Sequence, residues 1–225
     1  MMRGVAGRVA EWVGPQIAEA SDGILASAGI VEGFAGAGVG TKVLVFAGLF
    51  GLVAGSLACG AVEYTQTGAE RDQQLAELAG ERIQLAAAPD AELDELTQLY
   101  VSRGLSPRLA REVAVELTAH DALAAHAEAE HHIAPGSLPS PVRDGLAAGA
   151  AFVAGAVLPF LAIILIPGPP RAFVTFGIVL LALGLTGWIS AEISDVHPLR
   201  PILRTAGIGA VAMAITYAAG HLIHP

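Results

Sequence analysis

Four long apolar runs constrain this chain more than any other feature of its sequence. They cover residues 43–63, 145–166, 172–190 and 202–223. A helix that crosses the hydrocarbon core of a bilayer needs roughly 20 mostly apolar residues, and each run supplies about that number. The mean hydropathy is +0.60, and only 15% of the residues are charged, against about 25% in soluble domains. The sequence therefore predicts an all-α membrane protein.

A fifth run, residues 17–39, is less apolar because it contains Glu19, Asp22 and Glu32. An amphipathic helix lying on the membrane surface is the alternative reading. Pairs of small residues four apart favour close helix packing within lipid. Two such glycine pairs occur here, Gly29 with Gly33 and Gly36 with Gly40. We therefore expect a span, which makes five transmembrane helices, and we expect residues 1–15 to form a separate interfacial helix.

The distribution of positive charge predicts the orientation of these spans. Cytoplasmic loops are enriched in lysine and arginine. With a cytoplasmic N-terminus, ten of the 12 basic residues lie on the cytoplasmic side, and only Lys42 and Arg171 lie on the other. Residues 16–64 then hold spans one and two, and residues 142–225 hold spans three to five. A sharp turn is predicted at 167–170, between spans three and four.

The acidic residues are concentrated in the segment between the second and third spans. Of the 21 Asp and Glu residues, 14 lie between Glu70 and Asp144. The second span has no breaker except glycine from residue 43 to 88, so we expect one long helix that leaves the membrane. Proline and capping signals predict two more helices, 91–102 starting at Asp90 and a long one after Ser106 that runs to about residue 132. Residues 65–141 are thus predicted to form a cytoplasmic three-helix metal-binding insert.

Carboxylates and imidazoles in this insert recur at helical spacing. Residues three or four apart are neighbours on a helix surface, and this ligand set suits Zn, Fe and Mn. The candidate ligands from spacing are Glu77, Glu81, Glu92, Glu95, Glu112, Glu116, His120, His126 and Glu130. A solvated acidic face is the alternative. A ferritin-like di-iron site needs two Glu-x-x-His motifs, and only Glu128–His131 fits one, so we do not expect a ferroxidase.

Besides Glu19, three acids lie within the apolar runs, where an ionised side chain costs at least about 2.5–3.5 kcal/mol. Asp22 and Glu32 lie in the first run and are predicted to be successive stations of an ion path. Glu63 lies near the end of the second run, four residues after Cys59. The alternatives are that Glu63 emerges into water, that Asp22 bonds the amides of a helix break at Gly23, and that Cys59 only packs. Glu19 is expected at the membrane interface.

Charge and cysteine content exclude other classes. One cysteine does not form a disulfide scaffold, and a net charge of −9 with a pI near 5.1 excludes a nucleic-acid binder.

The order of short motifs resembles the vacuolar iron transporter family, which includes the yeast vacuolar iron/manganese transporter. The resemblance covers residues 15 to 222. The motifs are Ser21-Asp22-Gly23-Ile24, Ala54-Gly55, Glu63-Tyr64, Arg71-Asp72, Glu92, Glu95-Leu96, Tyr100, Arg103-Gly104-Leu105, Asp121, His126, Glu130, Ala150, Gly155-Ala156 and Leu158-Pro159.

The resemblance implies a homodimer with five transmembrane helices per chain. It implies an ion path at the dimer interface between the first two spans and a cytoplasmic domain that collects Fe²⁺ or Mn²⁺. Export from the cytosol is then driven by proton antiport. By position, Asp22 and Glu63 match path residues. Glu81, Glu92, Glu95 and Glu130 match metal-binding glutamates. Cys59 stands where the family often has methionine, Gln84 where it has glutamate, and His126 in the place of a methionine.

The sequence thus predicts a transporter and not an enzyme. Its substrate is Fe²⁺ or Mn²⁺, with Co²⁺ and Zn²⁺ as further candidates, and no permanent cofactor is expected. A membrane-anchored metal sensor or sink without transport is the alternative function, and a channel without proton coupling is another. The short chain, rich in Ala, Arg and Gly, favours a bacterial plasma membrane over a vacuole.

Overall fold

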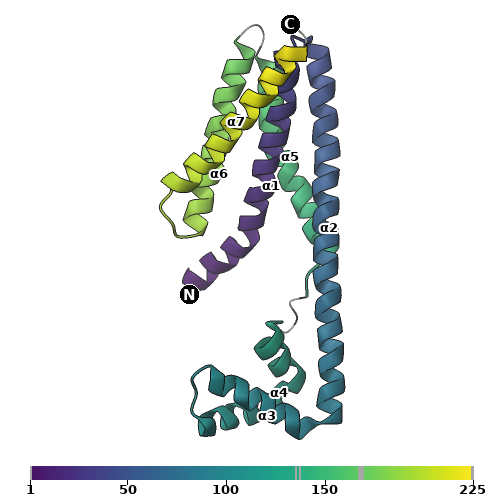
Figure 1. Cartoon of the computed structure of the whole chain (residues 1–225), viewed down its shortest axis with the longest axis vertical. Helices are drawn as coiled ribbons and strands as arrows, with labels where there is room; N and C mark the ends of the chain where they lie inside the picture. The colour runs from purple at the N-terminus through teal and green to yellow at the C-terminus, as the bar shows by residue number, and fades with distance from the viewer. Residues whose placement is uncertain (1, 135, 137, 167–169, 224–225) are drawn as a thin grey trace. The chain divides into compact units, whose positions relative to one another are not determined.

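The computed structural model describes residues 2–134, 136, 138–166 and 170–223, with side chains from residue 13 onward. All regular structure in these ranges is helical (Figure 1). Its seven helices are α1 (Met2–Gly36), α2 (Thr41–Ala87), α3 (Pro89–Ser102), α4 (Pro107–His131), α5 (Pro141–Leu165), α6 (Arg171–Ile193) and α7 (Leu199–Ile223). Most of the turn predicted at 167–170 lies outside the described residues.

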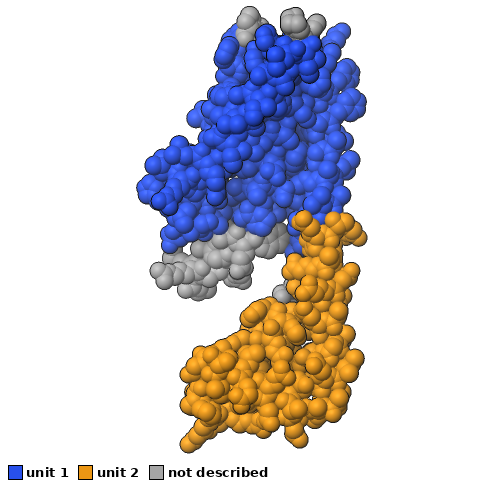
Figure 2. Space-filling view, in the orientation of Figure 1, with its two compact units in different colours: residues 1–63, 143–225 blue, residues 64–142 orange. Residues whose placement is uncertain are grey.

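The chain divides into two compact units (Figure 2). The first, here called the membrane unit, comprises Met1–Glu63 and Arg143–Pro225. The second, Tyr64–Val142, is the insert. The boundaries predicted from sequence, 65 and 141, differ from these by one residue at each end.

Within the described residues, four helices are long and apolar enough to cross a membrane: α2, α5, α6 and α7. Each also exposes large apolar side chains, such as Phe50 on α2, Leu146 on α5, Leu181 on α6 and Ile215 on α7. Exposed apolar surface on this scale needs a lipid or protein neighbour. A helix is the element whose backbone is satisfied inside a bilayer. The protein is therefore an all-α, multi-pass membrane protein.

Helix α1 differs from its prediction in two respects. It runs unbroken from Met2 to Gly36 with Pro15 inside it, so the predicted separation of residues 1–15 from the next helix is absent from the backbone. It also ends before residue 39, which leaves Gly40 outside the helix with open space around its Cα. A proline is tolerated inside a helix when neighbouring groups compensate for its missing N–H.

Helix α1 is not among the four apolar candidates, because its acidic residues lower its hydropathy. It nevertheless packs against α6 and α7. Its residues Ile24 and Ala28 lie in a buried cluster with Val179, Leu183 and Met213. Other helices therefore cover much of its surface, which explains why it is less apolar than they are.

Two glycines let α1 and α5 approach until their backbones touch. A Cβ added at Gly23 would collide with the carbonyl oxygen of Phe152, and one added at Gly155 would collide with that of Ala20. Small residues at helix crossings allow this close contact in lipid. The contact fixes the position of α1 along the axis of α5, and with it the position of Asp22.

Helix α2 is a single helix of 47 residues, as the absence of breakers predicted. At 1.5 Å per residue it is about 70 Å long, more than twice the roughly 30 Å of a hydrocarbon core. Its apolar part ends near Glu63, so Glu81, eighteen residues further on, lies well outside any membrane-spanning segment.

The insert departs from the predicted helix boundaries at two positions. Asp90 is not the cap of α3, because Ala88 is the N-cap and Pro89 is the first helical residue. Ser106 does cap α4, and its hydroxyl accepts from the N–H of Leu109 at 3.4 Å. Helix α4 has a kink that was not predicted, at Asp121, where φ is −160° and ψ is 96°.

Candidate metal centre and membrane carboxylates

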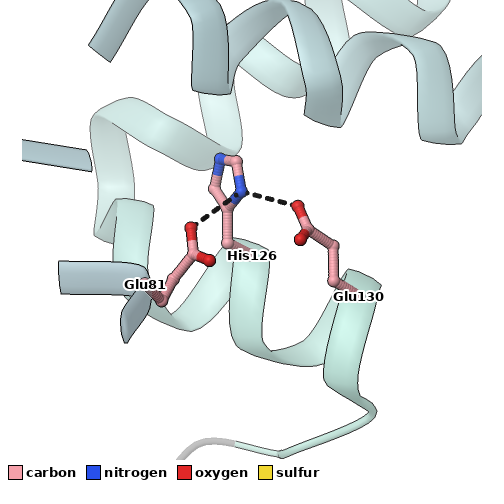
Figure 3. A group of neighbouring side chains, drawn as sticks. All are labelled: Glu81, His126 and Glu130. Carbon is pink, nitrogen blue, oxygen red and sulfur yellow. Dashed lines mark hydrogen bonds and ion pairs between the residues drawn. The ribbon is translucent and has the colours of Figure 1, made fainter. Parts of the chain in front are cut away.

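The insert gathers one imidazole and several carboxylates from three helices. Nδ1 of His126 lies 2.9 Å from Oε1 of Glu130 and 3.1 Å from Oε1 of Glu81 (Figure 3). Oε2 of Glu92 is 3.9 Å from the same nitrogen. Helix α2 supplies Glu81, α3 supplies Glu92, and α4 supplies His126 and Glu130. Three of these residues, Glu81, His126 and Glu130, offer ligand atoms that all lie within 4.8 Å of one another.

The kink in α4 sets the direction of the part of the helix that carries His126. The carboxylate of Asp121 accepts from the N–H of Ala124 at 3.0 Å, so it caps the second part of the helix. His126 and Glu130 are four residues apart on that part and share one face. Ala129 on this part of α4 packs with Leu96 of α3 and Ala114 of the first part. Packing and capping together therefore orient the histidine.

The cluster is buried, and part of its hydrogen-bonding capacity is unused. His126 is 0% exposed and Glu81 is 2% exposed. Within the described residues, Nε2 of His126 has no hydrogen-bond partner, and Oε1 of Glu81 has none beyond its ion-pair contact with Nδ1 of His126 at 3.1 Å. Such buried groups normally find one. Burial raises the pKa of Glu81, the charges of Glu130 and Glu92 add to the rise, and His126 opposes it.

The spacing of the ligand atoms suits a first-row divalent ion. Metal bonds of about 2.0–2.2 Å to nitrogen and carboxylate oxygen put two ligands about 3.4 Å apart at tetrahedral angles and about 3 Å apart at the right angles of octahedral coordination. The two short distances from Nδ1, 2.9 and 3.1 Å, agree with the octahedral value. A cation would also compensate the negative charge of the buried carboxylates. The donor set therefore fits Fe²⁺, Mn²⁺ or Zn²⁺.

Other predicted ligands in the insert lie outside this cluster. Glu77 accepts from the side chain of Gln73, and Glu112 pairs with Arg108 at 2.9 Å. Four more predicted ligands are exposed, Gln84, Glu95, Glu116 and His120, as is Glu128 of the Glu-x-x-His motif. The row Glu112–Glu116–His120 lies before the kink in α4, and no ligand group of three forms there among the described residues.

The membrane unit brings together a second group of chemically active side chains. The thiol of Cys59 on α2 donates to Oε2 of Glu19 on α1 at 2.6 Å. Asp22 and Glu63 also interact electrostatically with this thiol. Sequence reasoning assigned Glu19 to the interface and missed its place in this group. Its spacing of three residues from Asp22, which puts both on one face of α1, was the available signal.

Asp22 lies in an unbroken part of α1, so the alternative in which it bonds the amides of a helix break at Gly23 is wrong. Its side chain is exposed and lines a cavity of about 250 Å³ between α1, α6 and α7. Arg204 of α7 and Thr186 of α6 line the same cavity.

Glu32 occupies a different environment from the other acids of α1. It is 2% exposed, and it lines a separate cavity of about 250 Å³ with residues of α6 and α7. The two cavities have no lining residue in common. These two cavities therefore do not join Asp22 to Glu32, and the prediction that the two acids are successive stations of one path stays a prediction.

Comparison with known proteins gives the family. The model of the VIT family matches residues 14–221. The chain belongs to the vacuolar iron transporter family. It is 36% identical over 180 residues to the vacuolar iron transporter of Acanthamoeba castellanii, covering 80% of this chain and 69% of the relative.

Two plant relatives are more distant. Vacuolar iron transporter 1 of Tulipa gesneriana is 27% identical over 202 residues, which is 88% of this chain and 81% of the relative. Vacuolar iron transporter 1 of Arabidopsis thaliana is 25% identical over 201 residues, or 88% and 80% of the two chains. The resemblance inferred from motifs is thereby confirmed over nearly the whole chain.

Proposed function

We propose that this VIT-family protein transports a divalent transition-metal ion, Fe²⁺ or Mn²⁺, out of the cytosol in exchange for protons. The buried group Glu81–His126–Glu130, with Glu92 beside it, is the observation that carries the proposal. It offers a preorganised nitrogen and oxygen donor set in a chain of a family whose curated relatives are named iron transporters.

The insert collects the ion on its cytoplasmic side. Buried carboxylates without enough hydrogen-bond donors are costly, and a divalent cation removes that cost by pairing with them. Binding of metal therefore competes with binding of protons at Glu81, whose pKa is raised. Imidazole and carboxylate donors favour Fe²⁺ and Mn²⁺, while Co²⁺ and Zn²⁺ are further candidates.

The membrane unit carries the ion. In this proposal α1 is the fifth span, supported by its packing against α6 and α7 and by its backbone contact with α5. Glu19, Asp22, Cys59 and Glu63 are the ligands along the path. A thiol and carboxylates at one level of α1 and α2 offer oxygen and sulfur donors to a dehydrated ion, and the same carboxylates return protons.

The assembly is a homodimer with its path between α1 and α2 of the two copies. Large apolar side chains exposed on α2, including Phe46, Phe50 and Leu57, support a protein or lipid neighbour on that helix. The ten-to-two distribution of basic residues puts the N-terminus and the insert in the cytoplasm. A bacterial plasma membrane is the proposed location.

Transport by purified protein in liposomes with an imposed pH gradient tests the proposal. Wild type should carry Fe²⁺ or Mn²⁺ only when the gradient is present, and Asp22→Asn and Glu63→Gln should lose most of the flux. Glu192→Gln, which changes an exposed acid at the end of α6, is the matched control and should transport normally.

Other results would replace the proposal. Metal binding by the insert without any flux in wild type would indicate a membrane-anchored sensor or sink. Flux of equal size with and without the gradient would indicate a channel. Normal flux in both path variants would show that the ion takes another route.

A further inference from the structure

Glu32 is a buried carboxylate with an unused oxygen. Glu32 is 2% exposed, and within the described part of the chain its Oε1 has no hydrogen-bond partner. Arg171, which precedes the lining residue Ala172 in the sequence, is hydrogen-bonded to other groups. It donates to the carbonyl of Ile166 and to the hydroxyl of Thr41, both at 2.9 Å. A group with this burial ordinarily has a partner.

The carboxylate opens on a cavity between α1, α6 and α7. The cavity measures about 250 Å³. Its lining residues are Phe173, Phe176, Met213, Ala214 and Tyr217, together with Ala172. Phe173, Tyr217 and Ala214 are exposed, so the cavity is open at the outer surface of the helices. Glu32 is the one charged residue among the described residues that line it. The space is thus apolar with a single acidic group.

This chemistry does not suit a transition-metal ion. Such an ion needs four to six nitrogen, oxygen or sulfur ligands close together. The described walls offer one carboxylate, one phenol and one thioether, and helical carbonyls are already hydrogen-bonded. The ligand must therefore bring its own positive charge on an apolar body that tolerates contact with carbon.

Aromatic rings around a carboxylate are the features that recognise substituted ammonium groups. The ring faces attract the cation, and its alkyl groups fill apolar space without needing water. The volume is below the roughly 300–1,000 Å³ of sites for drug-sized ligands, so the ligand is small. We propose that Glu32 and this cavity bind a small organic cation of the alkylammonium or quaternary ammonium class.

The inference goes beyond metal transport and does not depend on it. The cavity shares no lining residue with the one at Asp22. Neither Cys59 nor Glu63 lines it. Binding can therefore be measured on metal-free protein, and its failure would leave the transport proposal untouched.

Isothermal titration of the full chain in detergent, with choline chloride as the probe, tests the inference. The neutral isostere 3,3-dimethylbutan-1-ol, in which carbon replaces nitrogen, is the matched ligand control. Wild type should bind choline saturably. The isostere should bind at least about tenfold more weakly, because it lacks the positive charge that the aromatic ring faces and Glu32 attract.

Three variants locate the site. Glu32→Gln should weaken choline binding at least about tenfold by removing the charge. Ala214→Leu should weaken it by filling the cavity while Glu32 remains. Ser27→Ala changes another buried polar residue of α1 that does not line the cavity, and it should bind like wild type. An unchanged gel-filtration profile shows that each variant is folded.

Equal affinity of wild type and Glu32→Gln would overturn the inference. So would binding of the neutral isostere as tight as that of choline, or the absence of saturable binding to wild type. Loss of binding in Glu32→Gln with normal binding in Ala214→Leu would place the ligand elsewhere and would also overturn it.

Discussion

Nδ1 of His126 lies 2.9 Å from Oε1 of Glu130, one helical turn further along α4, and 3.1 Å from Oε1 of Glu81 on α2. One nitrogen thus faces two carboxylates in a buried site. A proton on that nitrogen satisfies the arrangement, and a metal ion in its place would bond to all three groups.

Removing the imidazole should weaken metal binding by the insert. For His126→Ala we expect the affinity for Mn²⁺ to fall at least about tenfold, because loss of even an outer-shell partner costs 10–100-fold. Titration of the purified full chain with Mn²⁺ measures this. Glu116→Gln removes an exposed acid of the same helix and should bind normally. If both variants bound equally well, the metal would be held by the exposed acidic surface.

Metal affinity should decrease as the pH falls, starting above the ordinary pKa of a glutamate. Burial raises the pKa of Glu81 from 4.5, so the folded protein holds this proton at a higher pH. Metal must displace it, and affinity is lost as the pH falls through the raised pKa. Titrations between about pH 5 and 8, the range of usual protein work, should show a shallower pH dependence for Glu81→Gln. An unchanged slope would contradict the role of Glu81.

Asp121 should stabilise the kinked helix that carries His126. Asp121→Ala removes the cap on Ala124, which costs about 1 kcal/mol, and the melting temperature should fall together with metal affinity. Asp90→Ala is the control, because Asp90 does not cap α3, and it should cost only a few tenths of a kcal/mol. Thermal unfolding followed by circular dichroism measures both. A larger loss of stability in Asp90→Ala than in Asp121→Ala would contradict the assignment of the caps.

The contact between α1 and α5 should not tolerate a methyl group. Gly155→Ala places a Cβ against the carbonyl oxygen of Ala20, and overpacking of this kind costs about 1–3 kcal/mol. Gly177→Ala on α6 meets nothing within 4 Å and should gain helix propensity. The temperature at which half of the monodisperse gel-filtration peak is lost compares the two. Equal temperatures for the two variants would show that α1 and α5 can move apart without loss of stability.

Glu19 should be needed for transport, although sequence reasoning did not select it. Glu19→Gln keeps the size of the side chain but removes the charge beside Cys59. The expected result is a loss of flux comparable with that of Asp22→Asn, measured in the same liposomes. Flux at the wild-type level would mean that the Cys59–Glu19 contact serves packing alone.

Much of the fold could be predicted from local patterns in the sequence. The apolar runs gave α2, α5, α6 and α7, because the length of a span is set by the thickness of the bilayer and needs no knowledge of neighbours. Proline and serine signals located the start of α4 for the same local reason. The kink at Asp121 was not predicted, although aspartate is a common N-cap residue.

Which carboxylates meet was decided by tertiary structure. Helical spacing predicted Glu112 and Glu116 as ligands just as it predicted His126 and Glu130. The spacing in the sequence is the same whether the helix face is solvated or buried. Only the packing of α3 on α4 and the kink at Asp121 put His126 beside Glu81 of a distant helix.

The sequence by itself determined that the chain spans a membrane, carries an acidic helical insert and belongs among the vacuolar iron transporters. It also identified Glu32 as an acidic residue whose insertion into the membrane is costly. Only the tertiary structure decided that Cys59 contacts Glu19 and that Glu32 faces its own apolar cavity. The physical reason is that the hydrophobic pattern reports what each helix buries, while the partners of a buried polar group depend on how the helices cross.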